Sequence, residues 1–499
     1  MLTPTEEIIK LFATFSDDSI SSIDKLPQAG SERDYFRLHT ATGNFIATHG
    51  ANLQENETFI YFSTHFAAKH LSTAVIFCVS HDKTIYIQED FGNVSLLDKL
   101  EQLGYVPAVY SLYQQSLQRL ALLQIIGHQG IDYSKCLTNA SFGKEAIMAD
   151  LLYFKYYFLD ALRKPYDKQK LIRDFEALSN YLAHTEYKYF MYRDFQSRNI
   201  MVTPPLKGLE EVVHFIDYQG GMKGAPQYDV ASLLWQAKAN LPDEWKQKLL
   251  EDYMAAFEKI IDQPIDKDIF RSQYNGYVLI RLLQVLGAYG FRGLFERKAH
   301  FLTSIPLALQ NLKWFINNQS IGIAVPEFKK VLELCISDEV IQEFTPIQAT
   351  ADTPLLVTIQ SFSFIQNGYP VDESANGGGF VFDMRGILNP GRFTPYKHLS
   401  GLDKPVKDFL DQQTKMPDFL NSVYSIIDIS VEDYIKRGFK NLCINFGCTG
   451  GQHRSVYAAE ATARHLKNKF KVKIELEHLN KVNWKREMEM EKESTFPKS

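Results

Sequence analysis

The chain has 499 residues, which is too long for one compact core, and its 45% hydrophobic and 23% charged content is typical of globular proteins. The formal net charge of -5 argues against a global basic surface for nucleic acid. The five cysteines form no CxxC pair, which argues against a structural zinc site and favours a reducing compartment. We therefore expect a cytoplasmic protein of two or three domains.

The first segment, MLTPTEEIIKLF, predicts a capped helix. Thr3 or Thr5 stands ahead of Glu6 and Glu7, and this acidic pair lies where a signal peptide would carry positive charge. No apolar run approaches the roughly 18 residues that a membrane-spanning helix needs. We expect no membrane segment.

Strand signals come next and then give way to helices. Residues 20–50 predict strands and turns, with a hairpin in HTATGNFIAT, and TAVIFCVS and TIYIQEDFG predict two further strands. From about 95 to 185, and again from about 230 to 336, apolar residues recur at helical spacing. A strand-like block with YFMYRDFQSRNIMV and VVHFIDYQGG lies between them. A small mixed-sheet lobe followed by a large helical lobe is typical of protein kinases.

The second part of the chain has a different pattern. Residues 337–353 carry few large apolar side chains, and we predict a linker there, after a domain at 1–336. LLVTIQSFSF, GGGFVFDMR and NLCINFGC predict strands, SVYAAEATARHLKNKF predicts a helix, and together they predict an α/β domain at 354–480. Residues 481–499 predict a charged tail, either a frayed helix or disordered. The predicted fold class is thus α+β, a two-lobed protein-kinase-like domain followed by a smaller α/β domain.

The segments YRDFQSRN and FIDYQGG hold the residue types that phosphoryl transfer requires. That reaction needs a carboxylate to orient the acceptor hydroxyl, and oxygen ligands for magnesium. Asp194 and Asn199 are five residues apart, the spacing of a kinase catalytic loop, and Asp217 follows the strand VVHFI. The alternative is that both aspartates only cap turns.

With APQYDVASLL, these segments resemble the aminoglycoside-phosphotransferase superfamily, over about residues 5–330. Within it they look most like the sugar kinases that phosphorylate N-acetylmuramate and N-acetylglucosamine at the anomeric hydroxyl. The resemblance implies ATP as donor, Asp194 as catalytic base, and Asn199 and Asp217 as Mg²⁺ ligands. It also implies that Asp229 braces the catalytic loop.

The chain departs from this pattern in two places. Tyr192 replaces a histidine that is architectural in the family, so we expect local repacking. GSERDYFRL has one glycine where a Gly-rich loop is expected, and Thr48 occupies the position of the phosphate-pairing lysine. Arg33 and Arg37 are candidates for the missing charge, and we predict Arg37 as the nucleotide-binding residue. Glu89, in the segment 88–90, is predicted to present its backbone to adenine.

GCTGGQHRS lies between the strand NLCINF and a helix. Glycines in a strand-to-helix turn create an anion nest, and an arginine fork suits phosphate. Cys448, Arg454 and Ser455 also have the C-x5-R-S spacing of cysteine phosphatases, and a tight structural turn is the remaining alternative. The predicted phosphate-binding residues are Cys448, Thr449, Gly450, Gly451, Gln452, His453, Arg454 and Ser455.

Together with GGGFVFDMRGILNPGRFTPYKHLSGLDKPVKDFL, this segment resembles the C-terminal domain of the RapZ family, over about residues 354–480. In that family the domain binds small regulatory RNA and senses glucosamine 6-phosphate, behind a P-loop domain. No GxxxxGK[ST] occurs in this chain, and the charges of residues 351–499 nearly balance, which does not support an RNA-binding face. Other residues of the matching motifs are candidates for an anion pocket: Asp383, Arg385, Asn389, Arg392, Lys397 and His453.

The sequence thus predicts an ATP- and Mg²⁺-dependent kinase of a small hydroxylated substrate, an amino sugar, with a C-terminal domain that binds phosphate or a sugar phosphate. A nucleotide-binding regulator or RNA-binding adapter with little or no kinase activity is the first alternative, since the nucleotide-binding lobe is atypical. A kinase fused to a cysteine phosphatase is the second.

Overall fold

The computed structural model describes residues 3–26, 33–204, 210–372 and 379–484, and the chain divides into two compact units. The first unit comprises Met1–Leu294 and Ser304–Ile341, and the second comprises Phe295–Thr303 and Gln342–Ser499. A helix, α13 (Asp338–Phe344), occupies the first half of the segment predicted as a linker. The tail predicted at 481–499 lies outside the described residues from 485 onward.

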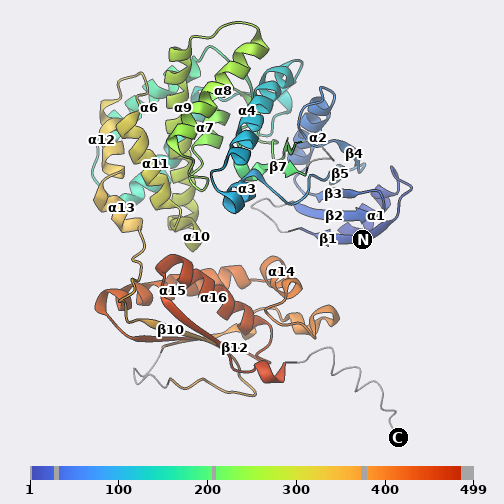
Figure 1. The fold of residues 1–499 in the computed structure, drawn as a ribbon, viewed down its shortest axis with the longest axis vertical. Coiled ribbons are helices and arrows are strands. Elements are labelled where there is room, and N and C mark those ends of the chain that lie inside the picture. The colour runs from blue at the N-terminus through green and yellow to red at the C-terminus, as the bar shows by residue number, and fades with distance from the viewer. Residues whose placement is uncertain (1–2, 27–32, 205–209, 373–378, 485–499) are drawn as a thin grey trace. The chain divides into compact units, whose positions relative to one another are not determined.

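A five-stranded antiparallel sheet of order β1-β2-β3-β5-β4 begins the first unit. Its strands are β1 (Ile20–Lys25), β2 (Asp34–Thr40), β3 (Asn44–His49), β4 (Ile76–Val79) and β5 (Ile85–Glu89). The predicted hairpin is the β2–β3 pair, and helix α2 (Leu53–Ala67) follows it (Figure 1). The predicted N-terminal helix is α1 (Pro4–Phe12), where Thr3 and Glu6 complete a capping box. The apolar face of α1 packs on the sheet through Ile8 and Phe12.

Helices make up most of the rest of the first unit (Figure 1). They are α3 (Leu96–Leu103), α4 (Pro107–His128), α5 (Lys144–Phe154), α6 (Lys168–Ala183), α7 (Gln227–Leu234), α8 (Asp243–Ile261), α9 (Lys267–Tyr289), α11 (Ile305–Asn318) and α12 (Pro326–Cys335). Short helical segments are η1 (Tyr133–Lys135), η2 (Lys155–Leu159), η3 (Asp160–Leu162), η4 (Ser197–Asn199) and η5 (Gly290–Phe295).

Two small antiparallel strand pairs lie between these helices in the chain. β6 (Tyr189–Met191) pairs with β9 (Met222–Gly224), and β7 (Ile200–Thr203) pairs with β8 (Val212–Phe215). The pairs correspond to the predicted strand-like block. They bring the ends of YRDFQSRN and FIDYQGG together, since each segment follows one strand and precedes another.

One helix is an exception to the expectation that no segment has membrane-spanning length. Within the described residues, the continuous helix Lys267–Phe295 passes that test by length and composition alone, and 56% of its most apolar window is buried in the structure. The helix packs its apolar residues in the core and carries the buried Arg281. These features are those of a core helix.

The second unit contains a parallel four-stranded sheet of order β11-β12-β10-β13. Its strands are β10 (Leu356–Ser363), β11 (Gly379–Asp383), β12 (Asn441–Cys448) and β13 (Lys473–His478). Helices α15 (Met416–Arg437) and α16 (Arg454–Phe470) cover one face of the sheet (Figure 1). The remaining helical elements are α10 (Ala299–Leu302), α14 (Lys404–Gln413), η6 (Met384–Gly386), η7 (Pro390–Arg392), η8 (Thr394–Tyr396) and η9 (Lys481–Asn483). The predicted fold class, a two-lobed kinase-like domain and a separate α/β domain, is confirmed.

Candidate active site and anion-binding loop

The loop that carries Asp194 is held by a buried carboxylate. Asp229 lies in α7 and is fully buried, and it accepts hydrogen bonds from the backbone N–H of Tyr192 at 2.8 Å and of Arg193 at 2.9 Å. A third bond comes from Gln124 Nε2 at 2.8 Å. The hydroxyl of Tyr192 donates to the carbonyl of Ile216, just before Asp217. Both predicted carboxylate loops are therefore tied to one scaffold.

Arg193 adds a second support. It has a left-handed backbone, φ 79°, which is uncommon outside glycine. Its guanidinium forms two bonds of 2.8 and 2.9 Å with Asp150 and lies over the ring of Phe142. Such a bidentate pair is geometrically specific, so it fixes the backbone immediately before Asp194.

Asp194 is held in its ionised form by positive charge. Its carboxylate lies 3.1 Å from the guanidinium of Arg281 and 3.4 Å from that of Arg198, and Gln196 also donates to it. Burial pushes the pKa of Asp194 upward, but these two guanidinium groups together with the bond from Gln196 outweigh it and lower the pKa below its ordinary value. The side chain is 35% exposed, so a substrate hydroxyl can reach it.

Asn199 and Asp217 lie together beside Asp194. Asn199 Nδ2 is 3.0 Å from the carbonyl oxygen of Asp194 and 3.4 Å from Asp217 Oδ2. Asp217 also has a left-handed backbone, φ 69°, and Gln219 Nε2 donates to its other oxygen at 2.8 Å. The three residues that the spacing singled out are thus brought into one cluster.

This cluster fits a magnesium ion. Mg²⁺ takes oxygen ligands and is usually held by one or two protein groups, with substrate phosphates and waters completing its shell. Asp217 and Asn199 supply such groups, and Gln219 Oε1 beside them is buried without a hydrogen-bond partner among the described residues. Among all the residues that the structure describes, no group of three or more His, Cys, Asp or Glu is arranged to hold a metal ion. Two ligands, Asp217 and Asn199, are what this type of site requires.

The residue predicted to bind nucleotide, Arg37, has a different position. Its guanidinium forms two bonds of 2.6 and 2.9 Å with Asp90 and further bonds with Asn93 and the carbonyl of Gly92. All of these partners lie in the connection between β5 and α3. Arg37 therefore braces this connection, and the geometry does not support the predicted contact with nucleotide. Glu89, the last residue of β5, donates its backbone N–H to the carbonyl of Val75.

Asp229 makes stability depend on pH. Burial raises its pKa to about 7 from an ordinary 3.8, against the lowering effect of its hydrogen bonds. The folded protein then holds this proton more tightly, so the group's stabilising contribution is full below about pH 4 and is lost as the pH rises through about 7. Asp229→Asn removes this group and leaves one N–H unpaired, at a cost of about 1–3 kcal/mol.

We expect the loss of stability caused by Asp229→Asn to be larger at pH 5 than at pH 8. Thermal unfolding of both proteins at the two pH values measures it. A loss that is equal or larger at pH 8 would contradict this expectation. It would mean that the donors from Tyr192, Arg193 and Gln124 keep the carboxylate ionised in the folded protein.

In the second unit, three backbone carbonyls of the loop between β12 and α16 accept hydrogen bonds from side chains outside the loop. The carbonyl of Thr449 accepts from Ser363 Oγ at 2.7 Å, that of Gly450 from Asn480 Nδ2 at 2.8 Å, and that of Gly451 from Trp484 Nε1 at 2.9 Å. In a trans peptide the N–H of the next residue points the opposite way. The amides of residues 450–452 therefore point away from these three donors, and that of Gly451 donates to Cys448 Sγ at 3.2 Å.

Gly451 is required for this shape. Its φ is 61°, and a Cβ there would lie 2.8 Å from Asn480 Cβ and 3.0 Å from Ser363 N. Consecutive amides that point the same way at the start of a helix form an anion-binding nest. Gly451 therefore fixes the backbone shape of this loop, and anion binding there stays a prediction.

Arg454 and Cys448 lie at the base of the loop. Arg454 is 4% exposed, Nη1 donates to the carbonyls of Arg385 and Ile387, and Nη2 lies 3.4 Å from Thr449 Oγ1. Its Nε is buried without a partner among the described residues, which leaves one donor for a ligand. Cys448 Sγ accepts from Gly451 N at 3.2 Å and lies 3.2 Å from Ser455 Oγ.

The other predicted residues of this loop have structural contacts. His453 Nε2 lies 2.8 Å from the carbonyl of Tyr396, and burial lowers the pKa of this histidine. Gln452 Nε2 donates to the carbonyl of Leu399. Among the additional candidates, Asp383 pairs with Arg385 at 2.7 Å, Asn389 caps η7, and Arg392 and Lys397 are exposed.

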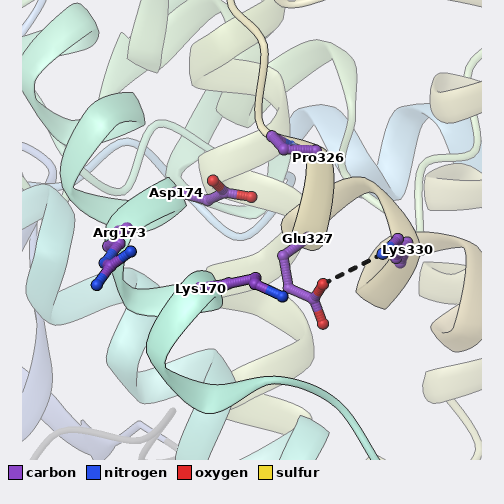
Figure 2. Close-up of a pocket in the computed structure, with 6 residues that line it drawn as sticks. All are labelled: Lys170, Arg173, Asp174, Pro326, Glu327 and Lys330. Carbon is purple, nitrogen blue, oxygen red and sulfur yellow. Dashed lines mark ion pairs between the residues drawn. The ribbon is translucent and has the colours of Figure 1, made fainter.

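Figure 2 shows a pocket elsewhere, between α6 and α12, lined by Lys170, Arg173, Asp174, Pro326, Glu327 and Lys330. Both acidic side chains of this pocket accept hydrogen bonds from backbone N–H groups. Asp174 accepts from the N–H of Phe328 at 2.8 Å, and Glu327 accepts from the N–H of Asp167 at 2.9 Å. These bonds tie the two helices together, and the pocket shares no residue with either candidate site.

Sequence reasoning missed Arg281 and Gln219. Arg281 is the one charged residue in the apolar stretch YVLIRLLQVL of α9, and an isolated charge inside a buried helix is a usable signal. Gln219 follows Asp217 by two residues, but nothing in its type distinguishes it from a turn residue.

Two family models match parts of the chain. Residues 25–264 match the model described as phosphotransferase enzyme family, and residues 355–481 match the RapZ C-terminal domain. The chain therefore combines a phosphotransferase-family domain with a RapZ C-terminal domain.

Curated relatives match parts of the chain. A nucleotide-binding protein of Clostridium acetobutylicum is 37% identical over 117 residues, 23% of this chain and 38% of that protein. One of Fervidobacterium nodosum is 34% identical over 197 residues, 36% of this chain and 65% of that protein. The chain thus spans less than two thirds of either relative.

Solved structures that match part of this chain include an aminoglycoside 2'-phosphotransferase-IIIa in its GDP complex, at 12% identity and a TM-score of 0.43, covering 63% of this chain and 100% of that one. A choline/ethanolamine kinase family protein from Mesorhizobium loti has 14% identity and a TM-score of 0.42, covering 66% of this chain and 99% of that one.

Proposed function

We propose that the first unit transfers the γ-phosphoryl group of ATP to a hydroxyl of an amino sugar, in the cytoplasm, and that the second unit binds a phosphorylated sugar. The observation that carries the first half is the cluster of Asp194, Asn199 and Asp217, with Asp194 partly exposed between two guanidinium groups. The amino sugar is supported by the sequence resemblance to sugar kinases and by the attached RapZ C-terminal domain.

In this reaction the acceptor hydroxyl donates a hydrogen bond to Asp194, which orients its oxygen toward the γ-phosphorus. The new O–P bond forms as the bond to the β-γ bridging oxygen breaks, and ADP leaves. Asp194 takes the hydroxyl proton late, since its lowered pKa makes it a weak base and the transition state is loose. Mg²⁺, held by Asp217 and Asn199, neutralises phosphate charge when it is bound.

The test is ATP consumption against a panel of amino sugars, with phosphorylated product detected by mass spectrometry. We expect magnesium-dependent turnover of about 1–100 per second with at least one sugar, the range typical of kinases. Asp217→Asn should lose both turnover and magnesium response, because an amide carries no charge to balance the ion. Asp252→Asn is a suitable control. The Asp252 carboxylate accepts hydrogen bonds from Tyr110 and Gln114 and lies outside the cluster.

A second candidate is a nucleotide-binding regulator without kinase activity. This candidate is favoured because position 48 is a threonine where a lysine is expected. The curated relatives of this chain are also named nucleotide-binding proteins. Tight binding of ATP with no turnover on any acceptor would support this candidate and contradict the kinase.

A further inference from the structure

The atypical nucleotide-binding lobe lacks a cation on the strand where kinases carry one. In kinases that lysine pairs with a glutamate from the following helix and contacts the nucleotide phosphates. Here β3 has Thr48, which lies opposite Tyr86 of β5 in the sheet. The following helix, α2, nevertheless has an acidic residue in its first turn, Glu55.

Arg33 reaches this position from the residue just before β2. Its Nη2 lies 3.2 Å from Glu55 Oε1 and 3.4 Å from Asp217 Oδ1, and its Nη1 lies 3.3 Å from the hydroxyl of Tyr86. Gln219 bridges the same two carboxylates, at 3.3 Å from Glu55 and 2.8 Å from Asp217. The positive charge thus stands between the acidic residue of the helix and the magnesium-binding carboxylate.

The contacts of Arg33 differ from those of the structural arginines nearby. Arg37 and Arg193 form paired bonds of 2.6 to 2.9 Å with a single carboxylate each. Arg33 instead contacts two different carboxylates at 3.2 and 3.4 Å, longer than the usual 2.7–2.9 Å of charge-assisted bonds. A planar guanidinium group suits phosphate oxygens as well as carboxylates.

Burial also suits this role. Arg33 is 2% exposed and lies against the rings of Tyr35 and Phe59, while the carboxylate of Asp217 beside it is 37% exposed. A phosphate that reaches Asp217 through a metal ion therefore comes close to the guanidinium. In such a water-poor position a charge-assisted bond is stronger than at the surface.

We propose that Arg33 replaces the missing lysine and binds the phosphates of the nucleotide, with Glu55 as its acidic partner. This inference rests on the proposed function of the first unit. It assigns the missing charge to Arg33, and leaves Arg37 as a brace of the connection between β5 and α3.

The test compares the affinities of Arg33→Met and wild type for MgATP, MgADP and adenosine, by calorimetry on the full chain. We expect MgATP and MgADP to bind roughly 10- to 100-fold more weakly to the variant, the scale of a lost bond to a charged group. Adenosine has no phosphate and should bind both proteins equally. A purely structural role for Arg33 would weaken all three ligands alike.

Arg33→Lys keeps the charge but not the fork, so we expect intermediate MgATP affinity and unchanged adenosine affinity. This variant decides the question if Arg33→Met does not fold. Arg37→Met is the matched control and should lower thermal stability while affecting MgATP and adenosine equally. If wild type binds MgATP and the Arg33 variants bind it as tightly, the inference alone fails. If wild type binds no nucleotide, the proposed function fails and the inference fails with it.

Discussion

Asp194→Asn should reduce phosphoryl transfer by about 10²–10⁴-fold, the usual contribution of a positioned general base. Asn is the preferred substitution because it keeps the shape that Gln196 and Arg281 contact. Loss of the negative charge leaves Arg281, which is 7% exposed, without its ionic partner. Some loss of stability is therefore expected together with the loss of rate.

The measurement is kcat for the sugar identified in the panel, with thermal unfolding to correct for stability and MgATP affinity to show that the nucleotide site persists. Asp252→Asn should leave kcat unchanged. Turnover of Asp194→Asn within a few-fold of wild type would reject Asp194 as the base. Loss of MgATP binding together with turnover would instead indicate that Asp194 supports the nucleotide site.

Much of the fold was predictable because its signals are local. The capping box of α1, the β2–β3 hairpin and the long helices of the first unit follow from residue type and spacing. Helices α14 and α15 and strand β13 were not predicted. β13 alternates isoleucine and leucine with charged residues over only six positions, which is short for a periodic signal.

In the candidate active site, too, the residues with a local sequence signal were predictable, and the contacts that depend on the fold were not. Asp194, Asn199 and Asp217 were identified because a catalytic loop has a fixed spacing along the chain. Arg281 could not be paired with Asp194 from the sequence, since the two are 87 residues apart and their contact depends on how α9 packs. Arg37 was preferred over Arg33 for the missing charge, although only the fold shows that Arg37 pairs with Asp90 in the connection after β5.

The loop between β12 and α16 has a local sequence signal and also contacts from residues that are distant in the chain. GCTGGQHRS indicates a nest through its glycines and its place between a strand and a helix. The donors that hold its carbonyls come from Ser363, Asn480 and Trp484, which lie 30 to 86 residues away from their acceptors. These donors satisfy buried carbonyls and fix the shape of the loop. The feature that favours a ligand there is Arg454 Nε, which is buried without a partner among the described residues.

Arg454→Ala should weaken binding of glucosamine 6-phosphate and of inorganic phosphate. Its guanidinium lies at the base of the loop with Nε unpaired, so its loss removes a charge-assisted bond worth about 1.5–3 kcal/mol, or roughly 10- to 150-fold in affinity. Calorimetry on the full chain measures this effect. Arg464→Met is the matched control, since Arg464 lies on the same helix with an exposed side chain.

Arg454 also supports the carbonyls of Arg385 and Ile387, so Arg454→Lys is needed beside the alanine variant to separate folding from binding. Lysine keeps the charge, and we expect it to retain part of the affinity. Cys448→Ser should change affinity little, since a hydroxyl can also accept from the N–H of Gly451. Release of phosphate from a phosphate ester by wild type, abolished in Cys448→Ser, would instead establish thiol chemistry. If neither ligand binds wild type at millimolar concentration, the anion site is rejected and the loop is a structural turn.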